Sequence, residues 1–158
     1  MPRKCRLYDF AAEYDSEPIT LENLRMAGHT GDCKRCREFV ARERQNVVDD
    51  LESWAEIENL GWAKDQDFER IKKGFKNNRK LCNKIDSFSG WAFVILEMAA
   101  NRVGRAIGGS DDVFRDALIH TVGLGRDEYV KALENPAEVL GKRIRNLDYT
   151  ESFNYCFC

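Results

Sequence analysis

Apolar side chains along this chain recur at the spacing of a helix. The clearest case lies within residues 32–59, where apolar positions follow one another at intervals near three, four and seven residues. These positions are Phe39, Val40, Val47, Leu51, Trp54 and Ile57. Such intervals place the side chains on one face of a long helix that ends near Asn59 and Gly61. No run of alternating apolar and polar residues is long enough to predict a strand, so the sequence predicts an all-α fold.

The other helices are predicted from the same spacing and from residues that start and stop helices. Four further segments are expected to be helical, namely residues 4–13, 18–28, 68–85 and 87–107. Gly108 and Gly109 end the last of them, and Ser110 caps the helix that follows. Asn135 and Pro136 start a final helix, because asparagine suits the cap position and proline suits the first helical position.

Length and charge limit the organisation of the molecule. The 158 residues suffice for one ordinary domain or two small ones. We place a domain boundary near residues 59–66, although no segment rich in proline or serine marks it. It separates an N-terminal unit of residues 1–62 from a helical region of residues 63–158. The formal net charge of −2 gives no overall attraction to nucleic acid or to an anionic membrane, so binding of either would need a local patch.

The sequence predicts a cytoplasmic protein. No apolar segment follows the basic N-terminus, as it would in a signal peptide. The most apolar run, residues 91–100, is short and contains Glu97, so a core helix is expected there and not a membrane span. The six cysteines should then be reduced, and clustered cysteines in that compartment are more often metal ligands than disulfides.

A zinc site is predicted at His29, Cys33 and Cys36. The Cys-x-x-Cys pair offers two thiolates on one turn at a helix start, where backbone N–H groups and the helix dipole stabilise negative charge. His29 lies four positions before Cys33 across a turn that contains glycine, so its imidazole can return to the same ion. The alternatives are a redox or metal-free cysteine pair and a chance spacing.

Cys5 is the best candidate for the fourth ligand. A helix, a turn and a second, antiparallel helix would return Cys5 to the other three residues, and a fourth protein ligand makes a structural zinc site. His120 is the main competitor, although it lies in an apolar segment and is more simply a satisfied core histidine. The remaining competitors are Cys82, Cys156 and Cys158.

This pattern resembles the zinc-binding anti-sigma factor domain. The resemblance covers about residues 1–60 and consists of Cys5, the His29-x-x-x-Cys33-x-x-Cys36 motif and the amphipathic helix that follows. Thr30 departs from the family, which usually has an apolar residue at that position. The resemblance implies a helical zinc domain that masks the polymerase-binding surfaces of a sigma factor. Some members of the family sense oxidants through the metal. For this chain the simpler expectation is that the zinc ion only stabilises a small helical domain.

Residues 70–84 form the strongest local concentration of positive charge. The segment contains no acid and carries seven cations, namely Arg70, Lys72, Lys73, Lys76, Arg79, Lys80 and Lys84. Such a patch suits phosphates or an acidic protein surface, and the alternative is a solvated helix face. Acidic residues of the preceding helix, Glu52 and Glu56 among them, are candidates to pair with these cations and neutralise the patch.

Catalysis finds little support in the sequence. Gly104, Gly108 and Gly109 lie close together but lack the strand that precedes a nucleotide-binding turn, and no pairing of nucleophile and base is evident. The apolar C-terminal residues 153–158 are expected to dock on the core. We therefore expect a non-enzymatic regulator that binds another protein, with a sigma factor or a polymerase subunit as the first candidate. The alternative is a zinc-stabilised adaptor or inhibitor, for example one connected with phage or defence, that binds protein or nucleic acid through residues 70–84.

Overall fold

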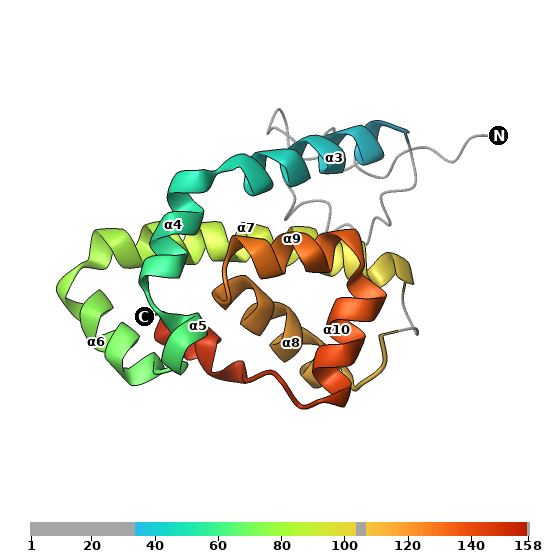
Figure 1. Cartoon of the computed structure of the whole chain (residues 1–158). Coiled ribbons are helices and arrows are strands. Elements are labelled where there is room, and N and C mark those ends of the chain that lie inside the picture. Colours follow the sequence, from blue (N-terminus) through green and yellow to red (C-terminus); the bar gives the residue numbers. More distant parts are fainter. Residues whose placement is uncertain (1–33, 104–106, 158) are drawn as a thin grey trace, which may run out of the picture. The chain divides into compact units, whose positions relative to one another are not determined.

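A computed structural model describes residues 34–103 and 107–157, with the backbone alone at residues 35, 36 and 151 (Figure 1). Every regular element in this part of the chain is a helix, which confirms the all-α class. The chain divides into two compact units, Met1–Asn46 and Val47–Cys158. Residues 47–62, which the sequence assigns to the N-terminal unit, belong to the second unit in the structure.

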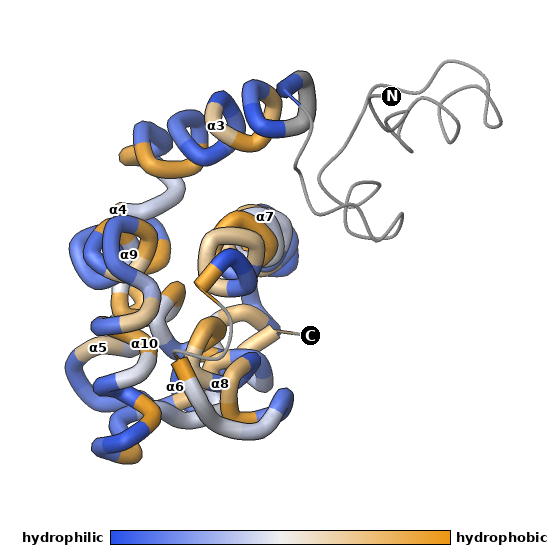
Figure 2. Tube along the Cα trace, turned by 90° about the vertical axis from the view of Figure 1, so that its right-hand side faces the viewer, coloured by the Kyte–Doolittle hydropathy of each residue, from blue (hydrophilic) through white to orange (hydrophobic). Residues whose placement is uncertain are grey.

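The first described helix, α3 (Lys34–Asp49), extends from the first unit into the second. The second unit then contains α4 (Leu51–Asn59), α5 (Trp62–Asp65), α6 (Phe68–Asn77), α7 (Arg79–Val103), α8 (Asp111–Gly123), α9 (Arg126–Glu134), α10 (Pro136–Arg145) and the 3-10 helix η2 (Glu151–Cys156). Orange and blue segments alternate along these helices in Figure 2, as expected for helices with one buried face. None of the described helices combines the length and the apolar character that crossing a bilayer requires.

The long helix predicted over residues 32–59 is divided at Asp50. The Asp50 carboxylate accepts hydrogen bonds from the Ser53 backbone N–H at 3.0 Å and from the Ser53 hydroxyl at 2.8 Å, which caps α4. The Trp54 indole N–H donates to the Val47 carbonyl at 2.7 Å across the break. The prediction of one continuous helix was wrong. The apolar spacing continues unchanged past Asp50, so it does not reveal that this residue ends one helix and caps the next.

A second correction concerns the basic segment. The sequence predicts one helix over residues 68–85 and another over 87–107, but α6 ends at Asn77 and α7 starts at Arg79. Asn78 alone joins them, and its side-chain oxygen accepts a hydrogen bond from the Leu81 N–H at 3.1 Å. The cations of residues 70–84 are therefore distributed over two helices.

The predicted helix starts at Ser110 and Asn135 are confirmed. The Ser110 hydroxyl accepts a hydrogen bond from the Val113 N–H at 3.4 Å at the start of α8. Asn135 accepts from the Glu138 N–H at 3.3 Å and donates to the Glu138 carboxylate at 2.7 Å, so each residue satisfies a polar group of the other. Pro136 occupies the first turn of α10, as expected.

The core of the second unit surrounds α8, which contacts α7, α9, α10 and η2. Ala117, Leu118 and Val122 of α8 are buried. Tyr129 of α9 is also buried, and its hydroxyl donates to the Ala92 carbonyl of α7 at 2.7 Å. This bond satisfies the one polar atom of a large core side chain.

The C-terminal residues dock on the core, as expected from their apolar character. Phe153 and Cys156 are buried, and the Phe153 ring lies 5.2 Å from the Trp62 ring between centroids. The Phe157 ring stacks on Phe75 of α6 at 5.6 Å. Gly123 of α8 permits this packing, since a Cβ atom there would lie 2.7 Å from Trp62 Cδ1 and 2.8 Å from the Phe153 ring.

Candidate partner-binding surface

The predicted zinc ligands cannot be placed together by the described part of the chain. Cys5, His29 and Cys33 lie outside the described residues, and Cys36 lies in the first turn of α3 with only its backbone described. Within the described residues, no group of three or more histidine, cysteine, aspartate or glutamate side chains is arranged to hold a metal ion. The zinc site remains a prediction from the motif.

Two of the three described competitors for the fourth zinc position are buried cysteines. Cys82 is a buried residue of α7, and Cys156 is a buried residue of η2. The Cys156 thiol lies 3.9 Å from the Ser152 carbonyl, and burial raises its pKa to about 12. A thiol that resists deprotonation is a poor metal ligand at neutral pH.

His120 is buried in α8, as predicted, with 1% of its surface exposed. The expectation that it is a satisfied core residue is not met, because neither ring nitrogen has a hydrogen-bond partner among the described residues. Its ring meets Trp62 edge-on at 6.0 Å, and the Trp62 indole N–H is similarly unpartnered there. Burial, followed by the positive charge of Arg143, lowers the pKa of His120 to about 4, so the ring is neutral at pH 7.

The seven cations of the basic segment are described, and the two at its ends are held by acids. At the α6 end, Arg70 donates to the Asp65 carboxylate and to the Leu60 carbonyl, each at 2.9 Å. The hydrogen bond from Arg70 is the main cause of a lowered pKa at Asp65, and Asp65 in turn raises the pKa of Arg70. Arg70 therefore supports the turn before α6, and the Asp65 carboxylate offsets the charge that Arg70 would present to a partner.

At the other end, Lys84 of α7 reaches back to α4. Its ammonium group lies 2.8 Å from Glu52 and 3.0 Å from Glu56, and hydrogen bonds to these carboxylates raise the pKa of Lys84. The predicted pairing of the acidic helix with the basic segment is thus present, but it is limited to Lys84. All three side chains retain contact with solvent, so the pairs add little stability.

Five cations between these ends have no ion pair with any described side chain, and we call them the basic surface. They are Lys72, Lys73, Lys76, Arg79 and Lys80. Four are exposed and Lys72 is half-buried. They are positioned by Ile71 and Phe75, which are buried on the inner face of α6, and by the turn at Asn78.

Three charges of the basic surface lie at spacings where they repel one another. Lys72 and Lys76 are four residues apart on α6, and Lys73 and Lys76 are three apart. Like charges at these spacings repel at a cost of about 0.2–0.5 kcal/mol per pair. The surface can supply several adjacent positive charges to an anionic partner, which would remove that repulsion.

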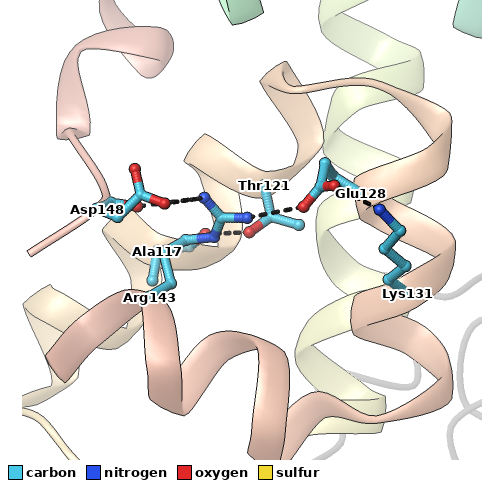
Figure 3. A network of polar contacts seen from close by, with 6 residues as sticks. All are labelled: Ala117, Thr121, Glu128, Lys131, Arg143 and Asp148. Carbon is cyan, nitrogen blue, oxygen red and sulfur yellow. Dashed lines mark hydrogen bonds and ion pairs between the residues drawn. The ribbon is translucent and has the colours of Figure 1, made fainter. Parts of the chain in front are cut away.

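A buried arginine network lies elsewhere in the second unit (Figure 3). Arg143 of α10 donates to Glu128 of α9 at 3.1 Å and to the Asp148 carboxylate at 3.2 Å, and Lys131 also pairs with Glu128 at 2.9 Å. The network joins α9, α10 and the segment that leads to η2, so it supports the core. The spacing of Glu128 and Lys131, three residues apart on α9, is typical of a helical ion pair. The contacts of Arg143 with Glu128 and Asp148 had no such indication in the sequence.

No family model, no curated protein and no solved structure matches this chain. The resemblance to the anti-sigma domain therefore depends on the motif residues alone.

Proposed function

We propose that this protein is a non-enzymatic regulator that acts by binding other macromolecules, and that the basic surface is one of its contact regions. The observation that carries the proposal is the separation between paired and unpaired cations. Acids hold Arg70 and Lys84, whereas the five cations between them have no described partner and repel one another. An anionic partner would supply the missing counter-charge.

The N-terminal unit contributes a second contact region in this proposal. Its support is the His29-x-x-x-Cys33-x-x-Cys36 motif, with Cys5 as the fourth ligand of a structural Zn²⁺. By its resemblance to anti-sigma domains, the unit would bind a sigma factor or another polymerase subunit and inhibit transcription. The basic surface would then hold an anionic region of the same assembly.

Capture from a bacterial lysate tests both regions. The zinc-loaded protein is immobilised, the lysate is applied in low salt, and the retained macromolecules are identified before and after a high-salt wash. The double variant Lys73→Gln/Lys76→Gln removes two charges from the basic surface. The matched control Lys142→Gln/Arg145→Gln removes two exposed charges from α10.

Two results are expected from this comparison. A partner held by the basic surface is lost in the high-salt wash and is depleted with the α6 variant but not with the α10 control. A sigma factor or polymerase subunit retained through the wash supports the anti-sigma assignment. Equal capture by the parent and the α6 variant at low salt would refute the role of the basic surface.

A further inference from the structure

We infer that the partner of the basic surface is the phosphodiester backbone of a nucleic-acid duplex. The inference rests on the proposed function, because it assigns a chemical class to what the basic surface binds. Three features of the surface carry it: its lack of exposed apolar side chains, its choice of cation, and its boundaries.

The surface lacks the apolar anchor of a protein interface. The large hydrophobic side chains that the described residues expose are Leu51, Trp91, Val103, Leu147 and Tyr155. None lies within residues 70–84, and Tyr155 of η2 contacts α6 at Phe68, before that segment, at 6.5 Å between ring centroids. Phe75, the aromatic residue of this segment, is buried against Phe157. Protein interfaces depend on buried aromatic or aliphatic anchors and are depleted in lysine, so an acidic protein is the poorer match.

The same absence distinguishes a duplex from a single strand. Proteins that hold single strands stack the bases on exposed aromatic rings. Because Phe75 faces inward, residues 70–84 offer no exposed ring for stacking. The exposed Tyr155 ring beside α6 contacts Phe68 in the acidic first turn, before the five cations. Phosphate contacts from these cations provide affinity without selecting a base sequence.

The cations suit a row of phosphates in kind and in number. Four of the five are lysines, which bind phosphates as mobile point charges, whereas arginine adds planar, two-point recognition of a single group. They occupy the last two turns of α6 and the first turn of α7, joined by Asn78. α6 alone is about 15 Å long, and a DNA duplex carries one charge per about 1.7 Å of its axis, so several phosphates lie within reach.

Acids bound the surface at both ends and limit its footprint. Asp65, Asp67 and Glu69 precede it, and Glu52 and Glu56 lie beside Lys84. These carboxylates would repel phosphates, so a duplex is confined to the five cations between them. The number of phosphate contacts should therefore be small, between about three and five, which predicts weak binding with a defined salt dependence.

The test is fluorescence anisotropy with the full, zinc-loaded chain and a labelled 24-base-pair DNA duplex. Three to five phosphate contacts predict that affinity falls about 40- to 500-fold between 50 and 200 mM KCl. The variant Lys73→Gln/Lys76→Gln should weaken binding at 50 mM KCl by at least about tenfold and lower the salt slope by about two. The control Lys142→Gln/Arg145→Gln should bind within about twofold of the parent. Circular dichroism of each variant checks that the helices are intact.

Parallel probes separate the possible ligands. A duplex RNA that binds as DNA does supports the shared backbone chemistry, and a preference for either duplex identifies the source. Tighter binding of a single-stranded DNA, or displacement of the duplex by polyglutamate at equal charge, would overturn the inference. If no nucleic acid binds while the α6 variant still loses a captured protein, the inference fails and the proposed function stands. If the α6 variant changes neither measurement, both fail.

Discussion

Single residues of the core show where side-chain volume is limiting. Gly123 faces Trp62 and Phe153 so closely that Gly123→Ala should force one ring to move, at a cost of about 1–3 kcal/mol in unfolding free energy. Gly74, on the exposed side of α6, is the control, because a Cβ atom there meets nothing within 4 Å. Gly74→Ala should stabilise the protein by about 0.5–1 kcal/mol. Urea denaturation measures both, and a Gly123→Ala protein as stable as the parent would contradict the described packing.

His120 predicts a pH dependence of stability at the residue scale. Its pKa falls from an ordinary 6.5 to about 4 in the folded protein, so the unfolded chain binds the extra proton between these values. The contribution of the neutral His120 ring to the free energy of unfolding is therefore fully present above about pH 6.5. It is lost as the pH falls toward 4, by at most about 3 kcal/mol. Arg143 opposes protonation and Asp148 favours it, but burial has the largest effect.

The measurement for His120 is urea denaturation at several pH values between 7 and 4.5. The variant His120→Leu removes the titrating ring and should lose less stability across this range than the parent does. At pH 7 the substitution should cost little, because it removes two ring nitrogens that have no described partner. Parallel losses of stability in the parent and the variant would show that the decline belongs to other groups.

At the scale of elements, η2 closes one side of the core. Phe153 is buried between Trp62 and Phe157, and η2 packs on α6 and α8. Phe153→Ala should destabilise the second unit by about 3–5 kcal/mol, since it removes a buried ring and leaves a cavity. Asn154→Ala, at the exposed neighbouring position, should change stability by less than about 0.5 kcal/mol. Similar melting of both variants would mean that η2 does not dock in solution.

The elements also show what sequence pattern could and could not predict. Helical class, the caps at Ser110 and Asn135 and the docked tail followed from local chemistry. The breaks at Asp50 and Asn78 did not, because apolar spacing continues across both and a single capping residue decides each. The basic segment was visible from composition. The pairing of Lys84 with Glu52 and Glu56 could not be decided from the sequence, because it depends on the packing of α7 against α4.

At the scale of the whole molecule, the predicted zinc ion should stabilise the N-terminal unit. Cys33→Ser removes one of four predicted ligands, so the purified variant should hold much less than one equivalent of zinc and should unfold at a lower temperature. Metal analysis and thermal melting measure the two effects. Ser16→Ala is the control, because Ser16 belongs to the same unit and is not one of the predicted zinc ligands. Full zinc content and unchanged melting in Cys33→Ser would refute the ligand assignment.

The most direct test of the basic surface is the salt concentration at which the protein elutes from heparin-agarose at pH 7.5. The net charge of −2 opposes retention on this polyanion, so retention must come from a local patch. We expect the parent and Lys142→Gln/Arg145→Gln to be retained and to elute close together, and Lys73→Gln/Lys76→Gln to elute at clearly lower salt. If the parent passes through unretained, or if the α6 variant elutes with the parent, the five cations do not form a binding surface.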